Sequence, residues 1–131
     1  MSQAAGHESE APEVLARWHA AVNAGDIDAA LACCADDVAV QGPRGTGHGH
    51  ELMRAWLTRS GIRLQPQGGP RELTGSPSSY TCVVHELAHW TAPDAPAGAP
   101  TEPVDTWCVF TVAGDLLTSV ARFETRADVP A

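Results

Sequence analysis

The sequence of 131 residues predicts a single domain of the α+β class. Apolar residues recur at helical spacing through the first half of the chain, as far as about Ser60. From Ile62 onward β-forming residues dominate, and Gly114-Asp115 has the chemistry of a tight hairpin turn. Helices first and an antiparallel meander afterwards favour α+β over a parallel α/β sheet.

Three helices are predicted. The first covers residues 12–24, and the second covers residues 27–34, with Asp26 as its N-cap and Asp36-Asp37 at its end. The third covers residues 49–60 and begins after a glycine-rich turn. The apolar anchors of this half of the chain are expected to be Trp18, Val22, Ile27, Leu31, Val38, Val40, Leu52 and Trp56.

Five strands are predicted, at residues 38–41, 71–74, 80–91, 104–113 and 116–123. The glycine-rich segment 42–47 should be a turn, and the proline-rich segment 92–103 an exposed loop. The strand at 80–91 carries apolar side chains on both faces, and the helices can cover only one of them. We therefore expect a homodimer that forms through the outer face of the sheet.

The ends of the chain and its charge limit the possible environments and partners. Residues 1–11 are predicted to be a flexible tail, residues 12–126 the folded domain and residues 127–131 a flexible C-terminus. No basic and apolar leader or membrane-length apolar run is present, so a cytoplasmic location is expected. Eight arginines, no lysine and sixteen acidic residues give a net charge of −8, which disfavours nucleic acid and anionic membranes.

The four cysteines form no C-x-x-C pair, so free and mostly buried thiols are expected. The segment His85-Glu86-Leu87-Ala88-His89 matches the zinc-protease pattern H-E-x-x-H. That chemistry requires a helix, whereas the surrounding residues predict a strand, in which positions four apart are separated by roughly 13 Å. No metal site is therefore expected.

In a strand, His85, Leu87 and His89 share one face, and that face could line an interior or lie at a subunit interface. If it lines the interior, His85 could act as a general acid or base. Asp105, near Trp107, could be a buried carboxyl group or a hydrated surface charge. The strand parity that decides between these alternatives is open from the sequence.

The segment AAVNAGDIDAALACCADDVAVQGPRG (residues 20–45) and the closing hairpin WCVFTVAGDLLTSVARF (residues 107–123) resemble the nuclear transport factor two-like superfamily. That superfamily includes ketosteroid isomerases, SnoaL-like polyketide cyclases and epoxide hydrolases. The resemblance extends over residues 12–123. It implies a cone, in which a curved, mostly antiparallel sheet wraps around the N-terminal helices and encloses an apolar pocket, and it implies a dimer.

The resemblance also permits a comparison with the isomerase residues. Gly42 stands where the isomerases have their aspartate base, and Trp18 stands where they have a tyrosine. Their protonated aspartate falls on Asp105 or Thr106. The cyclases use a histidine–aspartate arrangement, for which His85, His89 and Asp105 are the candidates.

We therefore expect a small-molecule protein that needs no cofactor and performs acid/base chemistry of the isomerase or cyclase kind on an apolar cyclic substrate. Asp105 and His85 are the predicted catalytic residues. A non-catalytic binding protein for an apolar metabolite and a dimerising domain are the alternatives. The predicted pocket residues are Trp18, Val22, Val40, Trp56, Leu87, His89, Trp107 and Phe123.

Overall fold

The computed structural model describes residues 13–42, 45–76, 79–90 and 102–129. The predicted N-terminal tail and most of the predicted loop at 92–103 lie outside these residues. The helices are α1 (Glu13–Ala24), α2 (Ile27–Ala32), α3 (His50–Ser60) and the short 3-10 helix η2 (Arg126–Asp128). The strands are β1 (Cys34–Gly42), β2 (Gly45–His48), β3 (Ile62–Pro66), β4 (Arg71–Ser76), β5 (Ser79–Trp90), β6 (Val104–Ala113) and β7 (Leu116–Phe123).

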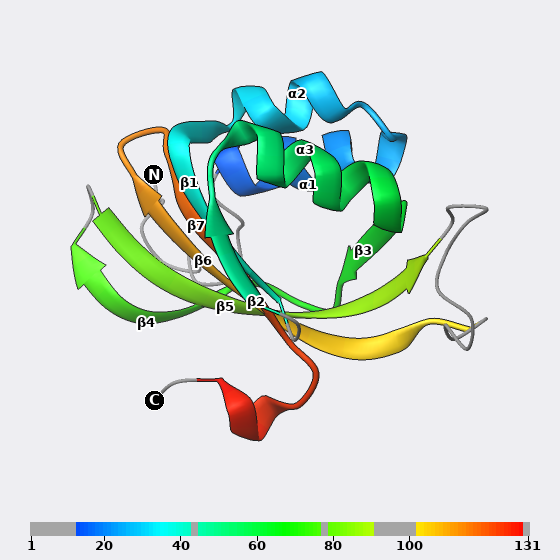
Figure 1. Cartoon of the computed structure of the whole chain (residues 1–131). Coiled ribbons are helices and arrows are strands. Elements are labelled where there is room, and N and C mark those ends of the chain that lie inside the picture. Colours follow the sequence, from blue (N-terminus) through cyan, green and yellow to red (C-terminus); the bar gives the residue numbers. More distant parts are fainter. Residues whose placement is uncertain (1–12, 43–44, 77–78, 91–101, 130–131) are drawn as a thin grey trace.

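The seven strands form one sheet in the order β2-β1-β7-β6-β5-β3, and β4 pairs with β5 outside this path. All pairs are antiparallel except β1 with β7. The sheet curves around α1, α2 and α3, which lie together on its concave side, while η2 lies on the other side (Figure 1). The predicted α+β class and the mostly antiparallel, curved sheet are confirmed.

Helix α1 forms because its apolar residues lie on one side and pack against the sheet. Its buried residues include Leu15, Trp18 and Val22. Gly25 ends it with a positive φ of 74°, a conformation that glycine adopts without strain. Asp26 then caps α2, as predicted, and accepts a hydrogen bond of 3.1 Å from the Ala29 N–H.

The boundaries around β1 differ from those predicted. Helix α2 ends at Ala32, and β1 already begins at Cys34, so Asp36 and Asp37 are strand residues with exposed side chains. A register shift between Cys34 and Ala39 in the pairing with β7 accommodates this early start. Strand β2 occupies residues that the glycine content had suggested were all turn, because they pair with β1.

Leu52 was wrongly predicted to be a core anchor, because it is 37% exposed. Helix α3 instead buries Met53 and Leu57, which are four residues apart and therefore on the same side of the helix. Leu52 lies beside them and packs against Gly47 of β2. The predicted end of this helix at Gly61 agrees with the left-handed conformation found there.

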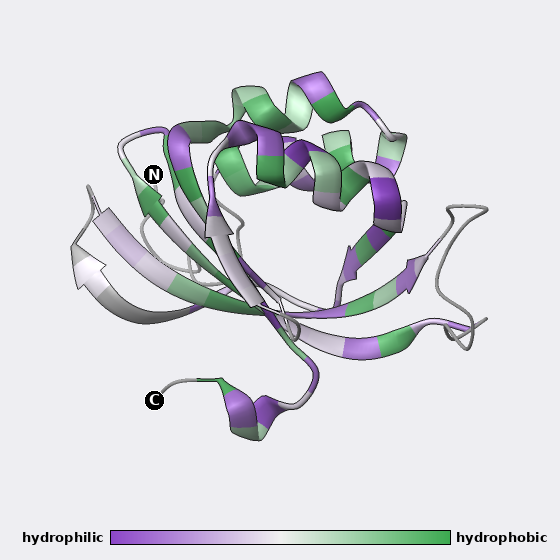
Figure 2. Cartoon of the chain, viewed as in Figure 1, coloured by the Kyte–Doolittle hydropathy of each residue, from purple (hydrophilic) through white to green (hydrophobic). Residues whose placement is uncertain are grey.

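The two faces of β5 and β6 have opposite environments, which settles the strand parity. The even-numbered residues of β6 from Thr106 to Val112 are buried beneath the helices, whereas odd-numbered ones such as Asp105 and Trp107 are partly or largely exposed. Figure 2 shows the apolar and polar residues along the helices and strands. No helix of the described residues is long and apolar enough to span a membrane.

Candidate functional site

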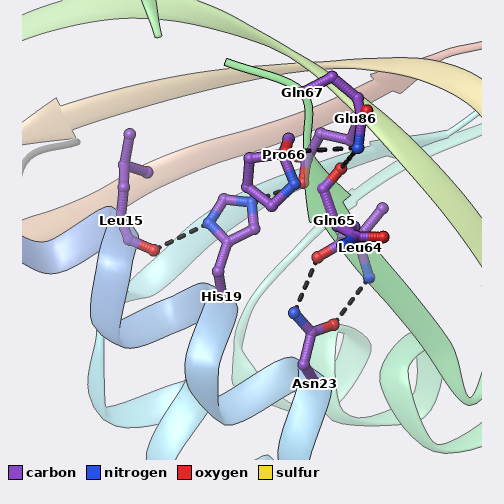
Figure 3. Close-up of polar contacts among 8 residues, drawn as sticks. All are labelled: Leu15, His19, Asn23, Leu64, Gln65, Pro66, Gln67 and Glu86. Atoms are coloured by element: carbon purple, nitrogen blue, oxygen red, sulfur yellow. Dashed lines mark hydrogen bonds and ion pairs between the residues drawn. The ribbon is translucent and has the colours of Figure 1, made fainter. Parts of the chain in front are cut away.

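The helix-covered face of the sheet holds a buried histidine–carboxylate pair (Figure 3). His19 Nε2 lies 2.8 Å from Glu86 Oε1, and His19 Nδ1 lies 2.8 Å from the carbonyl oxygen of Leu15. Glu86 is completely buried, and His19 is 8% exposed. Because burying a carboxylate is costly unless it is paired, a glutamate in this apolar core requires an explanation.

Helix α1 and strand β5 bring this pair together from positions 67 residues apart. Asn23, one helical turn beyond His19, forms hydrogen bonds of 2.8 Å with both the carbonyl and the N–H of Leu64. This contact holds α1 against β3, the neighbour of β5. Glu86 is an even-numbered residue of β5, so its side chain points toward α1.

The hydrogen bonds define the protonation of His19. The Leu15 carbonyl can only accept, so Nδ1 carries a proton and donates it. Burial lowers the pKa of His19, but the hydrogen bond to Glu86, the Glu86 charge and the Leu15 carbonyl together outweigh burial, and the pKa is raised above 6.5. The surroundings of His19 therefore stabilise its imidazolium form relative to that of a histidine in water.

The second carboxylate oxygen, Glu86 Oε2, is buried and has no hydrogen-bond partner among the described residues. The Cys108 thiol is a neighbour of this carboxylate and interacts with Glu86 through its charge and through a side-chain hydrogen bond. Burial and then the Glu86 charge raise the pKa of Cys108 well above its usual value, so the thiol stays neutral. An unpartnered buried acceptor costs about 1–3 kcal/mol, which a bound molecule with a donor group would recover.

Aromatic rings surround the His19 side chain. Trp18 and Phe110 make edge-to-face contacts with it, with ring centroids 5.2 and 5.4 Å away. The same two rings contact each other at 5.4 Å. Trp18 is fully buried, and its indole N–H has no hydrogen-bond partner among the described residues. The site thus combines apolar walls with a buried donor, Trp18 Nε1, which interacts with the Cys34 thiol, and a buried carboxylate, Glu86, which interacts with the Cys108 thiol.

An arginine lies on the same face of the sheet. Arg122 of β7 is the strand partner of Cys108, and its Nη1 donates a hydrogen bond of 3.1 Å to Thr106 Oγ1. Its guanidinium carbon lies 5.4 Å from the centroid of the Trp90 ring. Thr106 in turn stands directly opposite Glu86 in the pairing of β5 with β6.

The predicted catalytic residues lie on the other face. His85 Nε2 is 2.7 Å from Asp105 Oδ1, and the side chains are 39% and 61% exposed. The His85 ring stacks on Trp107, with centroids 4.9 Å apart. The structure therefore brings the two residues together, but on the side of the sheet away from the helices. Their catalytic role stays a prediction.

The predicted pocket residues divide between the two faces. Four of them belong to the helix-covered core or pack against it: Trp18, Val22, Val40 and Trp56. The other four have side chains on the outer face: Leu87, His89, Trp107 and Phe123. The sequence interpretation did not name His19, considered Arg122 only as a strand arginine without an evident acidic partner, and considered Glu86 only as part of the zinc-protease match. The available signal was the position of His19 between Trp18 and Val22 on the apolar side of α1.

The residues of the H-E-x-x-H match lie in β5, so the predicted strand is confirmed and the helical geometry of that motif is absent. Among the described residues no group of three or more His, Cys, Asp and Glu side chains is arranged to hold a metal ion. All four cysteines are free and buried, as expected. Burial, followed by the neighbouring Cys33, raises the pKa of Cys34 to about 12.

Three helices on the concave side of a curved, mostly antiparallel sheet define a small α+β protein with the nuclear transport factor two-like fold. The sequence profile of the SnoaL-like domain matches residues 15–120, and the chain belongs to this family. No protein of curated function matches the sequence significantly.

Three solved structures illustrate the fold. The epoxide hydrolase/cyclase-like enzyme SalBIII, which acts in pyran ring formation in the polyether salinomycin, is 18% identical with a TM-score of 0.66 over 88% of this chain and 91% of its own. A hypothetical protein from Catenulispora acidiphila with a ketosteroid isomerase-like fold, solved in complex with trimethylamine, is 20% identical with a TM-score of 0.64 over 92% of this chain and 91% of its own. The Anabaena orange carotenoid protein binding canthaxanthin is 15% identical with a TM-score of 0.67 over 86% of this chain and 35% of its own.

Proposed function

We propose that the protein is a cofactor-free acid/base enzyme of the isomerase or cyclase kind, acting on an apolar cyclic molecule at the His19–Glu86 pair. The observation that carries this proposal is a fully buried carboxylate that is held by a histidine through one oxygen and is free at the other. Perturbed ionisable groups in an apolar interior are typical of catalytic sites.

In the proposed reaction, Glu86 Oε2 takes a proton from an acidic C–H next to a substrate carbonyl. The electron pair of that bond moves into the carbonyl and leaves an enolate. Return of the proton to another carbon completes an isomerisation. Alternatively, the enolate carbon attacks a second carbonyl carbon of the same molecule and closes a ring; the electron pair of that C=O bond moves to its oxygen, which takes the proton back from Glu86. His19 is a positioning residue, because its imidazolium binds Oε1 and fixes the carboxylate.

The relatives support this class of reaction without identifying a substrate. SalBIII is described as an epoxide hydrolase/cyclase-like enzyme, and a structure from Pseudomonas putida as a polyketide cyclase. Both share only the fold with this chain at 18% identity. The chemistry proposed here therefore rests on the buried pair itself.

The test is proton exchange in D₂O, using cyclic 1,3-diketones and β-keto esters as probes, with deuterium uptake followed by NMR. The wild-type protein should accelerate exchange, and Glu86→Gln should lose about 10² or more of that acceleration. Asp105→Asn is the matched control, because it alters the exposed pair in the same way and should leave exchange unchanged. Equal exchange by the wild type and Glu86→Gln would remove Glu86 as the base. Loss of exchange in Asp105→Asn alone would support the outer pair instead.

A non-catalytic binding protein is the second candidate. The rings of Trp18 and Phe110 support it, as does the orange carotenoid protein, which binds canthaxanthin and shares this fold over 35% of its length. A tightly bound cyclic probe that undergoes no exchange in any variant would favour this function over the enzyme.

We also propose a homodimer through the outer face of the sheet. The supporting observation is a set of partly exposed apolar side chains there, which includes Leu87, Trp107 and Phe123. Light scattering at micromolar concentration should give twice the mass of 13.7 kDa, and Trp107→Glu should give the single mass. A monomeric wild-type protein at that concentration would contradict the dimer.

A further inference from the structure

Arg122 is placed unusually for an arginine. It lies on the helix-covered face and is partly buried, and burial lowers its pKa more than the electrostatic interactions with Cys108 and Glu124 raise it. Within the described residues no carboxylate forms an ion pair with it. A guanidinium group has five N–H donors. Among the side chains of the described residues, Thr106 is the one that accepts a hydrogen bond from Arg122.

Neighbouring groups fix the direction of the Arg122 side chain. The Thr106 hydroxyl donates a hydrogen bond of 2.9 Å to the Phe123 carbonyl, so its oxygen is available to accept from Arg122. Trp90 packs against the guanidinium at 5.4 Å. These contacts orient the group without neutralising its charge, which is the arrangement that an anion-binding arginine requires.

The pairing of the strands places Arg122 relative to Glu86, the proposed base. Glu86 of β5 is opposite Thr106 of β6, and Arg122 of β7 is opposite Cys108 of β6. Glu86, Thr106 and Arg122 therefore follow one another across three adjacent strands on one face. The backbones of β5 and β7 are two strand spacings apart, roughly 10 Å.

We propose that Arg122 binds a carboxylate of the substrate, so that the substrate is an apolar cyclic carboxylic acid whose reacting C–H lies at Glu86. This inference deepens the proposed function and rests on it for the reaction at Glu86. The carboxylate supplies the direct ion-pair partner that Arg122 lacks among the described side chains. The rings of the substrate lie between the two polar groups, over the apolar part of the face.

The experiment compares the binding of 1-naphthylacetate with that of its neutral analogue 1-naphthylacetamide, by tryptophan fluorescence and calorimetry at pH 7. The wild-type protein should bind the acid at least about tenfold more tightly, because a charge-assisted hydrogen bond contributes more than a neutral one. Arg122→Gln should lose this preference while keeping its affinity for the amide. Arg54→Gln is the matched control, because Arg54 is exposed and paired with Asp28.

Thermal unfolding of Arg122→Gln verifies that the variant is folded, and Arg122→Lys, which keeps the charge, should retain part of the preference. No preference in the wild type, binding of neither probe, or an unchanged preference in Arg122→Gln would each overturn the proposal. The preference should persist in Glu86→Gln. Tighter binding of the acid without proton exchange would therefore reject the proposed enzyme activity and support the Arg122 site. Proton exchange without tighter binding of the acid would support the activity and reject the site.

Discussion

Two histidine–carboxylate pairs in the described part of the chain lie on opposite faces of the same sheet. His19–Glu86 has a contact of 2.8 Å beneath the helices, and His85–Asp105 has a contact of 2.7 Å on the outer face. The distances are nearly equal, but the carboxylate of the inner pair is fully buried and that of the outer pair is 61% exposed. Burial, and not contact distance, separates the candidate catalytic pair from the surface pair.

The comparison has a physical basis. At the surface, water screens the attraction of an ion pair and solvates each partner when the pair opens. In the interior neither partner can be solvated, so each one controls the protonation of the other. The raised pKa of His19, against the effect of burial, is a consequence of this coupling.

The largest expected effect comes from breaking the inner pair. His19→Leu leaves the Glu86 carboxylate buried without a partner and should lower the free energy of unfolding by about 3 to 5 kcal/mol. Urea denaturation monitored by tryptophan fluorescence measures this loss. Asp105→Ala, measured at the same protein concentration, should lower the free energy of unfolding by less than about 1 kcal/mol. Losses of equal size would show that burial does not distinguish the pairs.

Removing both members of the inner pair tests whether an unpaired buried carboxylate causes the loss of stability in His19→Leu. His19→Leu combined with Glu86→Leu leaves no buried charge, so most of the stability lost in His19→Leu should return, to within about 2 kcal/mol of the wild type. The double variant should have no proton-exchange activity. A double variant that is as unstable as His19→Leu would mean that the loss comes from packing and not from an unpaired carboxylate.

The stability that the inner pair contributes should depend on pH in a direction set by the pKa of His19. Because the pKa of His19 is raised in the folded protein, protonated His19 stabilises the fold fully below about pH 6.5, and this contribution is lost as pH rises through the folded pKa. Histidine NMR should place the His19 pKa above 6.5. In Glu86→Gln the pKa of His19 should fall, because a neutral amide stabilises the imidazolium less than a carboxylate does, while burial still disfavours it. An unchanged His19 titration in that variant would contradict the coupling.

Much of the fold could be predicted from the sequence, because local signals agreed with the tertiary structure. The strands Val104–Ala113 and Leu116–Phe123 were predicted with the observed limits, since a glycine turn separates two β-rich runs. The cap at Asp26 was predicted from its side chain alone. Leu52 was misplaced, because a shift of one residue around a helix separates core from surface.

The candidate site could not be predicted in the same way. Residues 85 and 86 of β5 carry a histidine and a glutamate in succession, and strand parity alone decides which of them faces the helices. Each face of the sheet brings a histidine and a carboxylate together, His19 with Glu86 on one face and His85 with Asp105 on the other. The H-E-x-x-H match drew attention to the histidines, whereas the buried ionisable residue of the segment is the glutamate.

The smallest expected effect concerns the outer pair and its salt dependence. Asp105→Asn should change the free energy of unfolding by less than about 1 kcal/mol in low salt and by almost nothing in 1 M NaCl, where the screening length is about 3 Å. The destabilisation caused by Glu86→Gln should be nearly independent of salt, because the inner pair is shielded from ions. If the effect of Asp105→Asn is larger and grows with protein concentration, the outer pair is buried in the proposed dimer. The two pairs would then differ in the partner that buries them, a helix of the same chain in one case and a second subunit in the other.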